Sequence, residues 1–196
     1  MSGALEFLFA MAQAAWLFLP LVFAAAVAGI VIERDLMRWL RRPIDYGLSL
    51  GGRRLFGDNK TWRGVLVAVT CSAVFAAFQE HAIGDAVGEL LVVQWSRVPS
   101  ALFGALMGLG AMLGELPNSF VKRRLGVAPG RTTTGPWSLA FYVWDQVDLL
   151  FGAWLLISWW VNPSALLVGA SFALALLVHP AVSFVGWLIG ARKSPR

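Results

Sequence analysis

Long apolar stretches alternate with short polar segments along the chain, and five of them are long enough to cross a membrane. These stretches lie at about 7–32, 62–78, 98–116, 137–161 and 163–190. A transmembrane helix needs about 20 mainly apolar residues, which each stretch approaches or exceeds. The third carries Gly104, Gly108 and Gly110, and small residues let helices approach closely in lipid, so it is expected in the centre. The pattern predicts an all-α integral membrane protein: one transmembrane domain, 1–196, built as a bundle of about five helices.

Composition agrees with a surface largely covered by lipid. Hydrophobic residues make up 58% of the 196 positions and charged residues only 14%, whereas soluble domains carry about a quarter charged residues. The single cysteine, Cys71, excludes an internal disulfide. The two histidines, His81 and His179, are far apart in sequence, which argues against a zinc site.

Basic residues mark one side of the predicted bundle. All but Arg97 of the 16 lysines and arginines fall in 32–63, 117–137 and 191–196, which five crossings place on the same side. By the positive-inside rule that side is cytoplasmic, with the N-terminus outside and the C-terminus inside. The sequence therefore predicts a multi-pass protein of the cell membrane with cytoplasmic loops at 33–61 and 117–136. Attraction to anionic headgroups is sufficient to explain many of these charges.

The run GGRRLFGDNKTWRG at 51–64 has a composition that topology alone does not explain. Its glycines permit tight turns, and between them lie Asp58, Asn59, Lys60, Thr61 and Arg63. Loops of this kind fold around phosphates, with backbone N–H groups and cations neutralising charge. The Walker A pattern is absent, and a solvated connector is an equally good interpretation of this run alone.

Two carboxylates interrupt the fourth apolar stretch. Asp145 and Asp148 are three positions apart, so they project from one face of a helix. A charged side chain at such depth costs a few kcal/mol and is rarely kept without a partner. A salt bridge to another helix is one explanation, but no other stretch offers a central lysine or arginine. The pair favours Mg²⁺, which binds one or two carboxylates together with water and substrate phosphates.

The second basic segment supplies further polar groups. Glu115 ends the third apolar stretch, and Pro117 predicts a bend there with a new helix beginning at the proline. On such a helix Asn118 and Lys122 share a face. An amide and a lysine beside a carboxylate suit a triphosphate and its metal ion, whereas a cationic helix on the membrane surface is the alternative.

Five motifs follow one another in order along the polar parts of the chain. They are Pro43-Ile44-Asp45, GRRLFGDNKTWRG (52–64), NSFVKRRLGVAPG (118–130), DQVD (145–148) and a C-terminal stretch from His179 to ARKSP. Together they resemble the CDP-archaeol synthase family, archaeal relatives of the phosphatidate cytidylyltransferases, over most of the chain from about residue 40. The resemblance implies a five-helix membrane enzyme that uses Mg²⁺ and CTP to activate a lipid phosphate.

This resemblance leads us to expect a cytidylyl transfer. An oxygen of a lipid phosphate monoester would attack the α-phosphorus of CTP and give a CDP-activated lipid and pyrophosphate. Asp145 and Asp148 are expected to hold Mg²⁺, with Glu115 or Asp58 completing its coordination. Alignment and charge stabilisation are sufficient for such a reaction, because the attacking oxygen is already anionic.

The remaining candidates are expected to contact phosphates or nucleotide. Lys122 and Arg123 would hold the reacting phosphates as catalytic groups, and Asn118 and Ser119 would contact the nucleotide. The groups expected to close over the departing pyrophosphate are Asn59, Lys60, Thr61 and Arg63. The preference for cytosine is implied by the resemblance only.

Two other functions remain open at this stage. One is another lipid-phosphate enzyme; a CDP-alcohol phosphotransferase should carry four spaced aspartates, which this chain lacks. The other is a lipid transporter or scramblase, which predicts ionisable groups in several spans. The expected partners are CTP, an ether-linked or diacyl lipid phosphate and membrane lipid, with no nucleic acid; the oligomeric state is left open.

Overall fold

Five long α-helices dominate the computed structural model, which describes residues 3–83, 88–129, 131 and 135–188. They are α1 (Gly3–Glu33), α2 (Trp62–Phe78), α3 (Ser100–Arg124), α4 (Ser138–Val161) and α5 (Ala165–Leu188). Among the described residues, α1 to α4 are long and apolar enough to cross a membrane. For α2 this span includes residues of the π-helical turn that follows the helix. The last helix adds a shorter apolar stretch, Ala165–Val178. The predicted all-α membrane bundle is confirmed.

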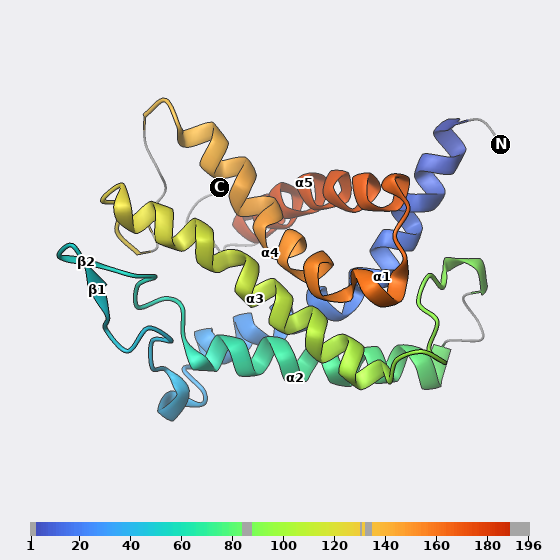
Figure 1. Ribbon diagram of the computed structural model, residues 1–196, viewed down its shortest axis with the longest axis horizontal. Helices are drawn as coiled ribbons and strands as arrows, with labels where there is room; N and C mark the ends of the chain where they lie inside the picture. The colour runs from blue at the N-terminus through green and yellow to red at the C-terminus, as the bar shows by residue number, and fades with distance from the viewer. Residues whose placement is uncertain (1–2, 84–87, 130, 132–134, 189–196) are drawn as a thin grey trace.

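The helices form a closed ring in which each one contacts both of its neighbours. Helix α1 contacts α2 and α5, α3 lies between α2 and α4, and α4 contacts α5. Figure 1 shows α3 running diagonally across α2, with α4 beside it. In a helix the backbone hydrogen bonds are made within the segment, which is what a lipid environment requires.

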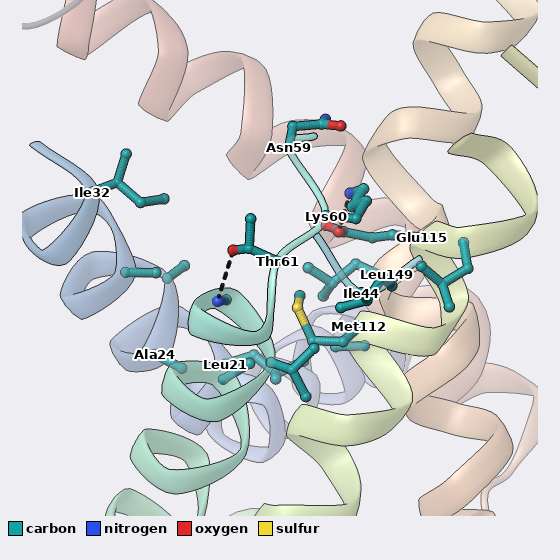
Figure 2. Close-up of a pocket in the computed structure, with 17 residues that line it drawn as sticks. Leu21, Ala24, Ile32, Ile44, Asn59, Lys60, Thr61, Met112, Glu115 and Leu149 are labelled. Carbon is teal, nitrogen blue, oxygen red and sulfur yellow. Dashed lines mark hydrogen bonds and ion pairs between the residues drawn. The ribbon is translucent and has the colours of Figure 1, made fainter. Parts of the chain in front are cut away.

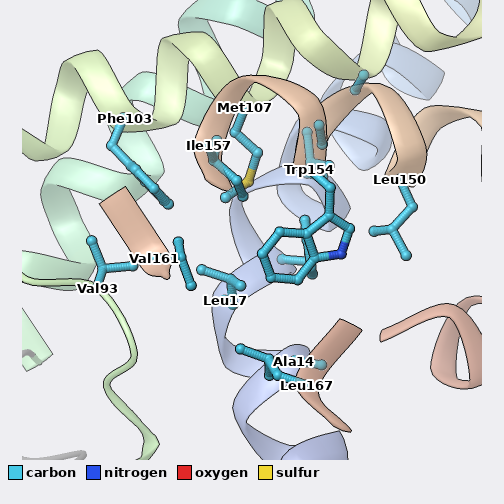
Figure 3. Close-up of a cluster of buried hydrophobic side chains, with 14 of the residues drawn as sticks. Ala14, Leu17, Val93, Phe103, Met107, Leu150, Trp154, Ile157, Val161 and Leu167 are labelled. Carbon is cyan, nitrogen blue, oxygen red and sulfur yellow. The ribbon is translucent and has the colours of Figure 1, made fainter. Parts of the chain in front are cut away.

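An apolar core fills much of the interior of the ring (Figure 3). It includes Leu17 from α1, Phe103 and Met107 from α3, Trp154 from α4 and Leu167 from α5. All five side chains are at most 6% exposed. The indole N–H of the tryptophan donates to a serine hydroxyl of α5 at 2.9 Å, so its polar atom is also satisfied. The core therefore packs the first helix, α1, against the last two helices, α4 and α5.

Glycines on opposite faces of α3 explain why this helix lies close to both neighbours. Gly104 and Gly108 face α2, where an added Cβ would collide with main-chain carbonyl groups. Gly110 and Gly114 face α4, and a Cβ on Gly114 would lie 2.9 Å from the Cα of Gly152. The close helix approach expected from the glycine spacing is thus confirmed, but α3 is one member of the ring and not its centre.

The new helix expected to begin at Pro117 is wrong. Helix α3 continues through the proline to Arg124, so the expected loop at 117–136 is helical over its first eight positions. A proline removes one backbone hydrogen bond, but helices in a bundle tolerate it where neighbouring contacts hold the segment. Here Glu115 and Asn118, on either side of the proline, bond to groups outside α3.

A small β-hairpin, which the sequence analysis did not predict, lies in the first loop. Strand β1 (Ser49–Leu50) pairs with β2 (Arg53–Arg54) in antiparallel fashion. Gly51 and Gly52 connect them with φ angles of 58° and 73°, as a type I′ turn requires. Elsewhere in this loop the N–H of Ile44 donates to the carbonyl of Lys60 at 2.9 Å, which fixes the loop at the start of α2.

Candidate active site

The two aspartates of α4 meet the polar face of α3. The side-chain amide of Asn118 donates to Asp145 at 2.5 Å and to Asp148 at 2.7 Å. The ammonium group of Lys122 bonds to the carboxylate of Asp145 as well. Asp148 and Asn118 are buried, whereas the side chain of Asp145 is 39% exposed. The structure therefore brings together four candidates, with one carboxylate of the pair buried and the other partly exposed.

Arg123, the residue after Lys122 in α3, leaves much of its hydrogen-bonding capacity unused. Its guanidinium is buried and donates to the carbonyl of Ala128 at 3.3 Å. Its Nε and Nη1 have no partner within the described part of the chain, and neither has Oδ1 of Asn118. Buried polar groups are normally paired, so such orphaned atoms point to a ligand that they bind. Gly57, at a φ of 102°, brings the first loop close, since a Cβ there would lie 3.1 Å from Arg123 Nη1.

The donor atoms of this cluster suit a magnesium ion. Asp145, Asp148 and Oδ1 of Asn118 present oxygen atoms, the ligands that Mg²⁺ prefers. Over residues 3–83, 88–129, 131 and 135–188, three or more His, Cys, Asp or Glu side chains do not gather into one group. Glu115 is paired with Lys60, and Asp58 is paired with an arginine of β2. Neither of these two carboxylates joins the aspartate pair.

Lys60 and Glu115 form an ion pair at the polar end of a cavity of about 190 Å³ (Figure 2). Asn59 and Thr61 line the same end, while the rest of the lining is almost entirely apolar and comes mostly from α1, α2 and α3, with Ile44 of the first loop and Leu149 of α4. Figure 2 shows Lys60 and Glu115 pointing toward each other across the gap between the first loop and α3. The structure therefore brings Lys60 and Glu115 together, and Glu115 lies about one helical turn before Asn118 on α3.

Other candidates are engaged in contacts that hold the first loop in place. Thr61 caps α2 by accepting a hydrogen bond from the N–H of Gly64 at 3.3 Å. Arg63 is buried and donates to the carboxylate of Asp35 at 3.0 Å and to a neighbouring carbonyl. The hydroxyl of Thr61 still has its own proton to donate to a phosphate, whereas the guanidinium of Arg63 is already paired with a carboxylate. Ser119 is buried in α3 beside Asn118.

Asp45 organises the first loop, although only the family resemblance drew attention to it. Its fully buried carboxylate accepts hydrogen bonds from the N–H groups of Phe56 and Gly57 and from Arg54 at 2.6 Å. Burial favours a higher pKa, but these bonds and the N–H of Gly47 outweigh it and lower the pKa of Asp45 to about 2. The Asp-x-Gly spacing to Gly47 is typical of an Asx turn and was the available sequence signal.

We expect the Asp45→Asn variant to unfold more easily at neutral pH than the parent protein, by about 2 kcal/mol. Because the folded-state pKa lies below the unfolded value, this stabilisation is complete above about pH 4 and is lost as the pH falls through about 2. Thermal unfolding in detergent from pH 2 to pH 7 measures it. Glu33→Gln, at the exposed end of α1, is the matched control. A parallel pH dependence in the Asp45→Asn and parent proteins would contradict this role.

Arg124 fastens the hairpin to the end of α3. Its guanidinium donates to the carbonyls of Arg53 at 2.8 Å and Arg54 at 2.6 Å, and also to that of Leu50. The side chain of Arg53 in turn bonds to the carbonyl of Arg124. The two polar segments predicted to act together are therefore physically joined, as Figure 1 shows at the end of α3 beside β2.

Part of the sequence-based assignment lies outside the described residues. Positions 130 and 132–134 before α4 and the C-terminal motif at 191–195 are in this group. The side chain of His179, where that motif begins, is also outside it.

The family model and the similar curated proteins name the same family. The model of the CarS-like family, CDP-archaeol synthase, matches residues 7–195. CDP-archaeol synthase of Halobacterium salinarum is 42% identical over 141 residues, covering 72% of this chain and 71% of the relative. That of Methanopyrus kandleri is 35% identical over 158 residues, with 79% of each chain covered.

A solved structure of an intramembrane enzyme for archaeal membrane lipids biosynthesis is also similar. It superposes with a TM-score of 0.62 at 29% identity, covering 86% of this chain and 91% of the other. Nearly the whole chain, the helix bundle and both polar segments fall within these matches. The chain therefore belongs to the CDP-archaeol synthase family.

Proposed function

We propose that this protein is a magnesium-dependent cytidylyltransferase that condenses CTP with a lipid phosphate and releases pyrophosphate. Family membership makes it a membrane-embedded, CTP-dependent cytidylyltransferase of lipid biosynthesis. Two observations carry the finer proposal. Asp145 and the buried Asp148 form a carboxylate pair with an orphaned amide oxygen of Asn118 beside it, and Arg123 of the same helix as Asn118 is a buried cation with two nitrogens that lack partners among the described residues. Such a set suits a metal–triphosphate complex better than a structural ion pair.

The aspartate pair is proposed to hold the metal ion. Asp145 and Asp148 would supply its protein ligands, with Oδ1 of Asn118 close by. When bound, Mg²⁺ neutralises negative charge on the phosphates of the nucleotide. Lys122 is already bonded to Asp145, so its ammonium group would lie beside those phosphates and add a second positive charge.

The reaction needs no protein nucleophile. A phosphate oxygen of the lipid attacks the α-phosphorus of CTP, and the bond to the β-phosphate oxygen breaks as pyrophosphate leaves. Arg123 is proposed to bind the oxygens that gain charge, because two of its nitrogens have no partner in the described part of the chain. A buried guanidinium is effective in this role, since little water competes for it.

The proposed orientation puts the site at the cytoplasmic end of the bundle. Both segments that form it carry most of the basic residues, and the hairpin with its neighbouring loop and the end of α3 lie together in the fold. By the positive-inside rule this end faces the cytoplasm and the N-terminus lies outside. There CTP reaches the site from water and the lipid reaches it from the inner leaflet.

A ligand-dependent unfolding assay tests the nucleotide. CTP with Mg²⁺, at about 100 times its Kd, is expected to stabilise the detergent-solubilised protein by about 2.7 kcal/mol, and ATP is not. The same sample should convert CTP and a lipid phosphate into a CDP-lipid and pyrophosphate, and a panel of ether-linked and diacyl acceptors identifies the lipid. Absence of both a CTP-specific shift and a CDP-lipid product would refute the proposed function.

A further inference from the structure

The cavity behind the Lys60–Glu115 pair has two chemically different ends. One end is polar and adjoins the proposed reaction site. The other is lined by small and aliphatic side chains, among them Leu21, Ala24 and Ala28 of α1. In Figure 2 the labelled side chains of α1 lie below and beside the first loop, away from Glu115. A polar mouth over an apolar interior suits an amphiphilic molecule, not a nucleotide.

The size of the cavity limits what it can hold. Its volume is about 190 Å³, and an apolar cavity of about 150 Å³ is large enough for benzene. It therefore has room for a short piece of hydrocarbon chain and not for a whole lipid. The lining also includes Ala25 and Ile32, which are exposed on the outside of α1. A chain that enters the cavity can consequently continue past these residues into the bilayer.

Charge defines the group expected at the mouth. The side chains of Lys60 and Glu115 are 20% and 23% exposed, so the pair is partly shielded from water. A phosphate monoester carries up to two negative charges and binds an ammonium group strongly in such surroundings. It can replace Glu115 as the partner of Lys60 without leaving the cation unpaired.

We propose that this cavity binds the lipid phosphate substrate, with the first carbons of one chain inside it and the phosphate on Lys60. The inference rests on the proposed function, since it assigns a place to the acceptor of that reaction. Glu115 and Asn118 are three residues apart on α3, which corresponds to about 4.5 Å along the helix axis. The phosphate would therefore lie about one helical turn from the aspartate pair, on the side from which it can approach the nucleotide.

A bulky side chain in the cavity tests the proposal. Ala28→Phe should raise the KM for the lipid phosphate at least tenfold and leave kcat and the CTP-dependent thermal shift unchanged. Ala26→Phe, exposed on the same helix and outside the cavity lining, is the matched control. Ala25→Phe is a second variant: it adds its ring at the exposed rim, where overpacking does not threaten folding. An unchanged KM in both cavity variants would overturn the proposal.

The phosphate contact is tested separately by binding. Native mass spectrometry of the purified protein compares a lipid phosphate, the corresponding lipid alcohol and inorganic phosphate. The parent protein should retain the lipid phosphate best, and Lys60→Met should bind the phosphate and alcohol forms equally. Equal binding by the parent, or retention of inorganic phosphate alone, would overturn the assignment. If the cavity variants lose lipid but the parent makes no CDP-lipid, the proposed reaction fails and the lipid site stands.

Discussion

Replacing Asp148 by asparagine is expected to lower kcat for cytidylyl transfer by about 10²–10³-fold while the bundle stays folded. Its carboxylate is buried, accepts a hydrogen bond from Asn118 at 2.7 Å and forms one half of the proposed metal site. Asparagine has nearly the same shape but lacks the negative charge that a divalent cation needs. The effect should therefore fall on catalysis and metal dependence rather than on folding.

Two measurements separate these effects. Initial rates at saturating CTP and lipid, titrated with Mg²⁺, report the loss in kcat, and thermal unfolding without ligand reports the fold. Glu89→Gln makes the same chemical change at an exposed position in the segment between α2 and α3 and should keep the parent rate. Near-parental activity of Asp148→Asn would show that this carboxylate is not a metal ligand.

A leucine at Gly152 is expected to disrupt the contact between α3 and α4 and to destabilise the protein by about 3 kcal/mol or more. A Cβ there would lie 2.6 Å from both the Cα and the N of Gly114 and would collide with the carbonyl of Gly110. These are backbone atoms, so a rotamer change cannot relieve the overlap. Moving α4 outward would also draw its aspartates away from Asn118, so activity should fall with stability.

Thermal unfolding in detergent measures this loss, expected as a drop of about 6–12 °C in Tm for a chain of this size. Gly169→Ala is the matched control: it lies in α5 with no atom within 4 Å of an added Cβ, and it should leave Tm unchanged or raise it slightly. A Gly152→Leu variant as stable as the parent would mean that the two helices are less closely packed than in this structure.

Much of the fold was predictable because lipid imposes a simple rule. A segment that crosses the bilayer must be apolar and about 20 residues long, so the predicted stretch at 62–78 has the same bounds as α2 and the one at 137–161 differs from α4 by one residue. The expectation at Pro117 failed because proline usually interrupts a helix in soluble proteins, and the sequence alone does not show the contacts that offset this. Its cost is real, but contacts on both sides of it keep α3 helical.

The sequence indicated which residues belong to the candidate site, but only a part of their pairings. The spacing of Asp145 and Asp148 already put both on one helix face, and the structure adds that Asn118 bridges them. Pairs such as Lys60 with Glu115 join residues 55 positions apart. Sequence spacing carries no information about such distant contacts, because they depend on how α3 lies against the first loop.

The attachment of the hairpin to α3 has a consequence for how this family can vary. Arg124 bonds to main-chain carbonyls, which every amino acid possesses, and not to the side chains of the strands. Substitutions in β1 can therefore accumulate without loosening this attachment, whereas β2 is constrained because its two arginine side chains bond to the carbonyl of Arg124 and to Asp45. Evolutionary constraint should thus be concentrated on Arg124 and the two arginines of β2 and relaxed in β1.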